Sequence, residues 1–214
     1  MAVELTVSPD LAALLRLGAL TCDVTRVVEH DSDLDEPISQ AEDVVAGSAD
    51  VFDVGPSRRL YRRIGIDPTK TRPSSEALLR RVRRGDRLPR VNTLVDIGNW
   101  CSLEAQLSYG LYDLDRIEPP VTVRRGVAGE AYPGIRKDEV HLDGRLALVD
   151  TRGPFGNPTS DSARTMVTTA TGRLLVVVFG PATVLPSAMS RVLDMTASRY
   201  ARYAGGVETW RRVD

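Results

Sequence analysis

The sequence predicts an α+β fold in which a mixed β-sheet is covered by helices. Helical patterns gather in the first half of the chain, strand patterns dominate from residue 109 to residue 179, and one more amphipathic helix follows them. With 214 residues, 42% hydrophobic and 27% charged, the chain has the length and composition to bury a core. We therefore predict a single domain over 1–214, with an N-terminal helical part at 1–85 and a core at 86–214.

The first half combines two strand patterns with a series of helices. Alternation predicts a strand from Val3 to Val7, and an apolar β-branched run predicts another from Ala19 to Val28. Helical spacing and capping residues place helices at 11–17 after Asp10, near 40–45, at 57–64 after Pro56, at 74–84 from Ser74, and at 91–107. The last of these is apolar enough to be largely buried.

Turn-forming dipeptides divide the second half into short strands. These strands are predicted at 109–114, 121–125, 140–142, 146–150, 166–169 and 174–179. A helix from Ser187 to Tyr203 follows, and the glycine pair at 205–206 ends it. The residues from 153 to 165 are predicted to form a loop.

Composition narrows the classes of function. Cys22 and Cys101 lie far apart in sequence and form no metal-ligand cluster, and no apolar run approaches the roughly 18–20 residues needed to cross a bilayer. The N-terminus lacks the basic segment and apolar run of a secretory signal. We therefore expect a cytoplasmic protein with no metal, no cofactor and no membrane partner, and the oligomeric state stays open.

The net charge of −1 conceals a strong asymmetry. Residues 1–55 carry twelve acidic side chains against two arginines, whereas residues 58–90 carry eleven arginines and one lysine against three acidic side chains. Clustered guanidinium groups bind phosphates bidentately, so the basic segment is either a phosphate-binding strip or a solvated face packed near the acidic segment. The candidate phosphate contacts are Lys70, Arg72, Arg80 and Arg84.

Two groups of polar residues are candidates for a site. Asn92, Asp96 and Asn99 recur at spacings of four and three on one face of the predicted 91–107 helix, and Glu104 follows. Buried polar groups need partners, so this face is either a structural network or a pocket wall. The loop after Gly153 either satisfies its own backbone or presents polar groups to a ligand. Its candidate residues are Asn157, Ser160, Asp161 and Thr165.

Residues 90–117 read RVNTLVDIGNWCSLEAQLSYGLYDLDRI, which resembles a segment of bacterial phenylalanyl-tRNA synthetase β chains. That segment runs N-R-V-V-D-V-T-N-Y, then L-E, then F-D-L-D-K-I. Further similarity lies in VTVRRGVAGEAY and LDGRLALVDTRGP. The patterns YRRIGIDPTKTRPSSEALLRR and GPFGNPTSDSARTMVTTAT are similar to stand-alone members of the B3/B4 group. The resemblance implies a B3/B4-like fold.

In the synthetase this domain is the editing module, which hydrolyses tyrosine wrongly esterified to the tRNA for phenylalanine. The resemblance therefore implies that the chain hydrolyses a mischarged aminoacyl-tRNA ester in trans, with tRNA rather than DNA as partner. Asp161 is then expected to orient a water and Thr165 to donate to an oxyanion, with Asn157 as the third catalytic candidate. The expected substrate pocket comprises Asn92, Asp96, Asn99, Glu104 and Ser160.

Three positions depart from the family's pocket. The family's threonine is here Gly98, its histidine is Gly110, and its glutamate falls near Val176 or Val177. These residues predict a wider and less polar pocket. Three functions stay open: hydrolysis of a different acyl ester, a non-catalytic module that binds tRNA or an amino acid, and a protein-interaction scaffold. A functional pocket requires Asn99 and the loop after Gly153 to face one cavity.

Overall fold

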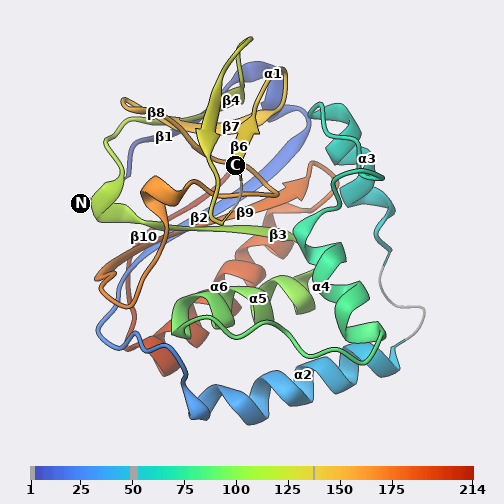
Figure 1. Cartoon of the computed structure of the whole chain (residues 1–214), viewed down its shortest axis with the longest axis vertical. Helices are drawn as coiled ribbons and strands as arrows, with labels where there is room; N and C mark the ends of the chain where they lie inside the picture. Colours follow the sequence, from blue (N-terminus) through green and yellow to red (C-terminus); the bar gives the residue numbers. More distant parts are fainter. Residues whose placement is uncertain (1–2, 49–52, 137) are drawn as a thin grey trace.

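A computed structural model describes residues 3–48, 53–136 and 138–214. Figure 1 shows a layered molecule in which one sheet lies above a second, and helices lie below the second sheet. The helices are α1 (Pro9–Ala12), α2 (Asp35–Gly47), α3 (Gly55–Arg63), α4 (Ser74–Arg83), α5 (Thr93–Ala105) and α6 (Pro186–Ala204). The strands are β1 (Leu5–Val7), β2 (Leu15–Asp23), β3 (Ser108–Asp113), β4 (Val121–Arg125), β5 (Ala131–Pro133), β6 (Glu139–His141), β7 (Leu146–Asp150), β8 (Gly153–Gly156), β9 (Arg173–Pro181) and β10 (Val207–Val213).

The strands form two four-stranded sheets and one hairpin. The central sheet has the order β10-β2-β9-β3 and is antiparallel throughout. The outer sheet has the order β1-β4-β7-β8, in which β1 and β4 run parallel and the other pairs antiparallel. β5 and β6 pair separately. The α+β prediction, with a mixed sheet and covering helices, is therefore confirmed.

The central strand β9 is buried on both faces, which explains its continuous apolar sequence. Leu174, Val176 and Val178 belong to the core between the central sheet and the helices. Leu175 and Val177, which alternate with them, belong to the core between the two sheets. The two hydrophobic cores therefore lie on opposite faces of one strand.

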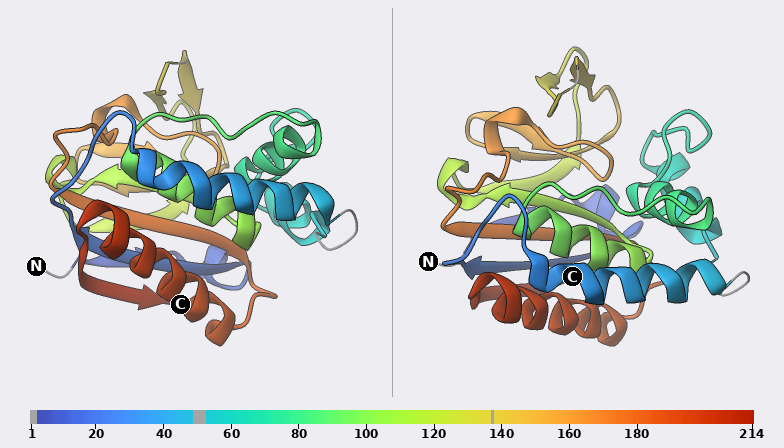
Figure 2. Two further views of the ribbon diagram at one scale, coloured as in Figure 1. Left: turned by 90° about the horizontal axis from the view of Figure 1, so that it is seen from below. Right: turned by 60° about the horizontal axis from the view of Figure 1, so that its bottom comes forward.

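Helices cover the face of the central sheet that the outer sheet leaves open. α5 packs against β3 and α6, and α6 packs against β2. Figure 2 shows α2, α5 and α6 on the same side of the sheet in both views. No helix in the described part of the chain is long and apolar enough to span a membrane. The helix α5 carries three of the candidate residues, namely Asp96, Asn99 and Glu104.

Two predicted elements are wrong. The predicted helix at 11–17 ends at Ala12, because Leu15 to Asp23 pair with β9 along their whole length and this pairing outweighs a weak helical pattern. The predicted strand at 166–169 is absent, and Met166 makes an isolated bridge to Tyr112 instead.

Three observed strands were not predicted. β8 contains two glycines and a proline, which are rare in strands, and β5 is only three residues long. β10 follows a glycine pair that signals the end of a helix and gives no sign of a strand. Each of them is formed by pairing with a strand that is distant in sequence or across a turn. Local sequence patterns carry no information on such pairing.

Candidate functional site

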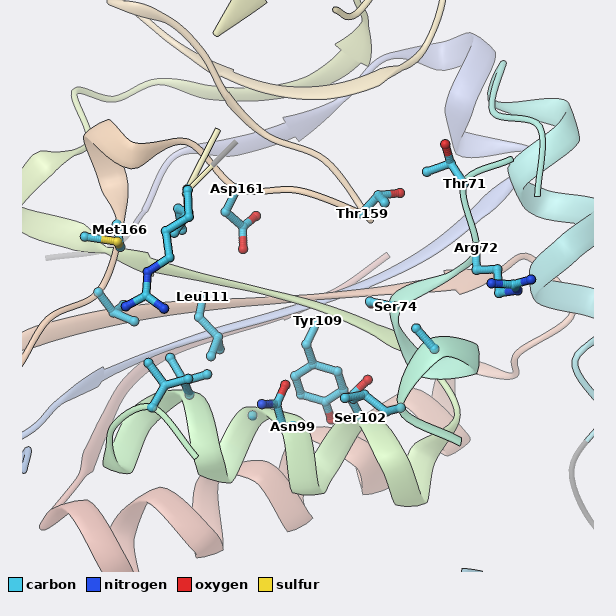
Figure 3. A pocket seen from close by; sticks show the side chains of 18 of the residues that line it. Thr71, Arg72, Ser74, Asn99, Ser102, Tyr109, Leu111, Thr159, Asp161 and Met166 are labelled. Atoms are coloured by element: carbon cyan, nitrogen blue, oxygen red, sulfur yellow. The ribbon is translucent and has the colours of Figure 1, made fainter. Parts of the chain in front are cut away.

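A cavity of about 720 Å³ lies between α5, β3, the start of α4 and the loops that precede α4, join β5 to β6 and follow β8. In Figure 3, Asn99 points into it from α5 and Asp161 points into it from the opposite loop, so their side chains face each other. Thr159 lies on the same loop as Asp161. The structure thus brings Asn99 and the bend after Gly153 to one shared cavity.

The polar face of α5 divides into structural residues and one cavity residue. Asn92 is the N-cap, and its side chain accepts a hydrogen bond from the Val95 N–H at 3.0 Å. Asp96 is buried and accepts from Arg90 Nε at 2.7 Å. Asn99 lines the cavity, and its amide has no hydrogen-bond partner in the part of the chain that the structure describes. The Asn99 amide is therefore the group on this face that a ligand can engage.

Tyr109 and Leu111 line the cavity from one face of β3, two residues apart. The Tyr109 hydroxyl lies 2.9 Å from Thr196 Oγ1, and burial raises the pKa of Tyr109 well above its ordinary value, so the phenol stays neutral. Apolar side chains of the neighbouring elements complete this wall, namely Leu78, Val95, Met166 and Val167. This part of the cavity suits an apolar group.

The loop opposite α5 is held by hydrogen bonds to its backbone. Asn157 Oδ1 accepts from the N–H groups of Thr159 and Ser160, at 2.8 and 2.9 Å, which closes a tight turn. The Tyr61 hydroxyl donates to the Pro158 carbonyl at 2.8 Å. The Tyr132 hydroxyl donates to the Ser160 carbonyl. These bonds fix the positions of Thr159 and Asp161 at the cavity.

Asp161 is the one acidic residue among the described residues that line the cavity. Burial in the first place, and the Asp161 charge in the second, raise the pKa values of Tyr112 and Tyr132. Both phenols therefore stay protonated beside a carboxylate. No described histidine or cysteine lines the cavity, so Asp161 is the lining group best suited to hold a water molecule by accepting its proton.

Of the residues that the structure describes, three with cationic side chains line the cavity: Lys70, Arg72 and Arg136. Arg72 Nε lies 3.9 Å from Glu76 Oε1, and Figure 3 shows its guanidinium pointing away from Asn99 and Asp161. Within residues 3–48, 53–136 and 138–214, no carboxylate forms an ion pair with Lys70 or Arg136. Unpaired cations beside a cavity favour an anionic ligand.

Several predicted site residues lie away from this cavity. Thr165 is fully buried, and its hydroxyl donates to the Phe155 carbonyl at 3.5 Å. Glu104 accepts hydrogen bonds from Trp100 Nε1 and from Arg199. Asn157 and Ser160 line a neighbouring hollow. The cavity therefore contains Asn99 and Asp161 of the predicted catalytic and pocket residues.

Some basic residues of segment 58–90 line the cavity, and others pair with acidic side chains. Lys70 and Arg72 reach the cavity, whereas Arg80 and Arg84 lie on or just after α4, where they contact Glu76 at 2.9 Å and Asp86 at 3.5 Å. Further along, Arg87 pairs with Glu42 at 2.8 Å and Arg90 with Asp35 at 2.6 Å. For these last two arginines, the interpretation as a face packed against the acidic segment is confirmed.

The prediction of a wider pocket is wrong at both glycines. A Cβ on Gly98 would lie 2.6 Å from Leu111 Cδ1, and a Cβ on Gly110 would lie 2.2 Å from the Tyr112 hydroxyl. The side chains of Leu111 and Tyr112 therefore fill the space that the glycines leave. Val176 and Val177 are fully buried in β9 and line the two cores rather than the cavity.

Sequence reasoning missed several lining residues. Tyr109 and Leu111 stand in a strand that was predicted, but alternation could have assigned them to a shared face only if the covering helix had been known. Met166 and Arg136 are brought in by loops. Among the described residues, no group of three or more histidine, cysteine and acidic side chains could hold a metal ion.

Comparison with known proteins identifies the family. The model of the B3/4 domain matches residues 56–211, which is well over half of the chain. The chain belongs to the B3/4 domain family. It is 31% identical over 163 residues to the phenylalanine–tRNA ligase β subunits of two strains of Xanthomonas campestris pv. campestris, strain 8004 and strain ATCC 33913. These matches cover 71% of this chain and 19% of each β subunit, so this B3/4 chain spans about a fifth of their length.

A solved structure agrees on the fold. An N-terminal fragment of the phenylalanyl-tRNA synthetase β subunit from Pyrococcus horikoshii superposes with a TM-score of 0.52 and 16% sequence identity. The match covers 99% of this chain and 54% of the fragment. At this identity the likeness shows a shared fold.

Proposed function

We propose that this B3/4 domain hydrolyses the ester bond of mischarged aminoacyl-tRNAs in trans, in the cytoplasm. The observation that carries the proposal is the cavity in which Asn99 and Asp161 face each other beside an apolar wall. The family adds support, because the related β subunits are named for a tRNA ligase and the resemblance points to their editing module. In this proposal the apolar wall and the cations bind the substrate, and Asp161 and Asn99 take part in the hydrolysis.

Binding follows from the apolar wall and the cations. The wall that includes Leu111 and Met166 receives an apolar amino-acid side chain, and Lys70 and Arg136 attract the phosphates of the acceptor end. The expected substrates are therefore esters of apolar amino acids.

Hydrolysis requires a positioned water and donors for the developing oxyanion. Asp161 orients the water, whose oxygen forms a bond to the ester carbonyl carbon. The Asn99 amide, on the opposite side of the cavity, donates to the carbonyl oxygen as it gains negative charge. Asp161 accepts a proton from the water as the bond to the carbonyl carbon forms. The bond between that carbon and the ribose oxygen then breaks, and Asp161 passes the proton to the ribose oxygen. The products are the free amino acid and the uncharged tRNA.

A second candidate is a non-catalytic module that binds tRNA or a free amino acid. It is favoured by the chemistry of the lining, since Asp161 is the one acidic group in the described wall and neither histidine is part of it. A binding module needs the apolar wall and the cations but no reactive group. The two candidates differ in whether the ester is lost.

The test is to incubate the full chain with a panel of tRNAs that carry apolar, polar or charged amino acids, and to follow ester loss. Hydrolysis of the apolar esters well above the spontaneous rate is the expected result. The Asp161→Asn variant should be slower by about 10²–10⁴-fold, the usual range for a general base. Saturable tRNA binding without accelerated ester loss for any member of the panel would favour the binding module instead.

A further inference from the structure

A second hollow of about 260 Å³ adjoins the main cavity. The two share Thr71 and Thr159, which therefore form a divide between them. Figure 3 shows these two threonines close together, at the end of the main cavity next to Arg72. A ligand that fills the main cavity can continue past this divide without leaving the surface.

Arg145 is the first sign that this hollow receives a ligand. Its side chain is half-buried and lines the hollow. Across residues 3–48, 53–136 and 138–214, its guanidinium forms no ion pair and no hydrogen bond. The donors of this guanidinium are therefore available to a bound ligand that has acceptor atoms.

Other polar groups of the hollow have complementary chemistry. Asn157 uses Oδ1 for the turn of the loop, and its Nδ2 has no acceptor within the described part of the chain. Glu139 and His141, on β6, line the hollow and are exposed. The hollow therefore offers hydrogen-bond donors from Arg145 and Asn157 and an acceptor from Glu139. The planar groups of His141 and Arg145 are surfaces on which a base can stack.

We propose that this hollow binds the base of the nucleotide next to the terminal adenosine of the acceptor end, a cytidine. The inference rests on the proposed function, since it assumes that the terminal aminoacylated nucleotide occupies the main cavity. Cytosine presents the N4 amino group as a donor, which suits Glu139, and the O2 and N3 atoms as acceptors, which suit Arg145 and Asn157. Uracil has a carbonyl in place of the amino group and would face the Glu139 carboxylate unfavourably.

Charge decides which part of the nucleotide enters the hollow. The Glu139 carboxylate repels a phosphate there but accepts a hydrogen bond from a base. The phosphodiester that joins the two nucleotides then lies at the divide of Thr71 and Thr159. Lys70 precedes Thr71 in the chain and has no ion-pair partner among the described residues, so its ammonium is available for this phosphate.

The experiment measures how tightly the full chain binds two RNA hairpins that carry no amino acid, one ending in CCA and the other in CUA. The full chain should bind the CCA hairpin about tenfold more tightly, within the range of one good base contact. Arg145→Ala should weaken binding of the CCA hairpin, and Glu139→Gln should reduce the preference for cytidine. Arg191→Ala, which removes an exposed charge on α6, is the matched control and should preserve the preference.

The outcomes separate this inference from the proposed function when the same hairpins are also tested as aminoacyl esters. Ester hydrolysis with equal binding of the two hairpins would overturn the second hollow as a cytidine site and leave the function intact. A clear preference for CCA without hydrolysis of any ester would support the hollow and refute the catalytic proposal. Equal or absent binding together with no hydrolysis would overturn both.

Discussion

The Tyr61 hydroxyl is expected to hold the loop that carries Asp161, and the variant Tyr61→Phe tests this. The hydroxyl is buried, donates to the Pro158 carbonyl at 2.8 Å and lies 3.1 Å from Ser108 Oγ. The hydroxyl also accepts a longer hydrogen bond from Thr159 Oγ1 at 3.4 Å. Phenylalanine keeps the ring and its packing, so the variant removes these three hydrogen bonds without opening a large cavity. At about 1 kcal/mol for each of the two shorter bonds, to Pro158 and Ser108, the free energy of unfolding should fall by about 2 kcal/mol.

The Pro158 carbonyl keeps a weaker contact from Ser74 Oγ at 3.4 Å, which limits the loss. For a chain of this size, about 2 kcal/mol corresponds to a fall in Tm of about 4–8 °C. Urea unfolding followed by tryptophan fluorescence measures the free energy directly. The matched control is Tyr203→Phe, because the Tyr203 hydroxyl has no hydrogen-bond partner in the described residues, and it should stay within about 0.5 kcal/mol of the parent. A Tyr61→Phe variant as stable as this control would refute the role of the hydroxyl.

Three further predictions concern the cavity wall, a buried carboxylate and a predicted catalytic residue. Leu111→Ser should lower kcat/KM for esters of leucine and phenylalanine by about tenfold and spare esters of serine, and a uniform loss in a deacylation panel would contradict an acyl-binding role. Glu76→Gln should lower the free energy of unfolding at pH 7 by about 1–3 kcal/mol, because Arg58 and Arg80 donate to this carboxylate. The Arg58 guanidinium holds the pKa of Glu76 below its ordinary 4.5, so the contribution is present above that pH and lost as the pH falls through the lowered pKa. If the free energy of unfolding differs between parent and variant by the same amount at pH 7 and at pH 3, this role of the Glu76 carboxylate is wrong. Thr165→Val should leave the deacylation rate within about threefold of the parent and lower the free energy of unfolding by about 1 kcal/mol. A hundredfold loss of rate would instead indicate that Thr165 is catalytic.

Sequence reasoning located most helices and the strands with strong local patterns. It placed β4 and β7 at their observed bounds, and it anticipated that α5 would be buried. It failed where pairing between distant strands decides the structure, as at the start of β2, where a helix was predicted, and in β10. Periodicity measures a preference of a segment, whereas a strand in a sheet is stabilised by its neighbours.

The site was also predictable only in part, because its contacts join residues that are distant in sequence. Spacing put Asn92, Asp96 and Asn99 on one face of a helix, but it could not show that the first caps the helix, the second pairs with Arg90, and the third faces a cavity. Likewise, the sequence marked the loop after Gly153 as rich in polar groups. Which of them turn inward depends on Tyr61 and Tyr132, which are distant in sequence and hold its backbone.

The proposed site is tested most directly by a crystal structure of the full chain with a stable amide analogue of leucyl-adenosine, in which nitrogen replaces the ester oxygen. We predict that the analogue occupies the cavity between α5 and the loop of Asp161. Its carbonyl oxygen should lie within hydrogen-bonding distance of the Asn99 amide, and its leucine side chain should lie against Leu111. An analogue bound elsewhere, or an empty cavity in crystals grown at millimolar analogue, would contradict the proposed site.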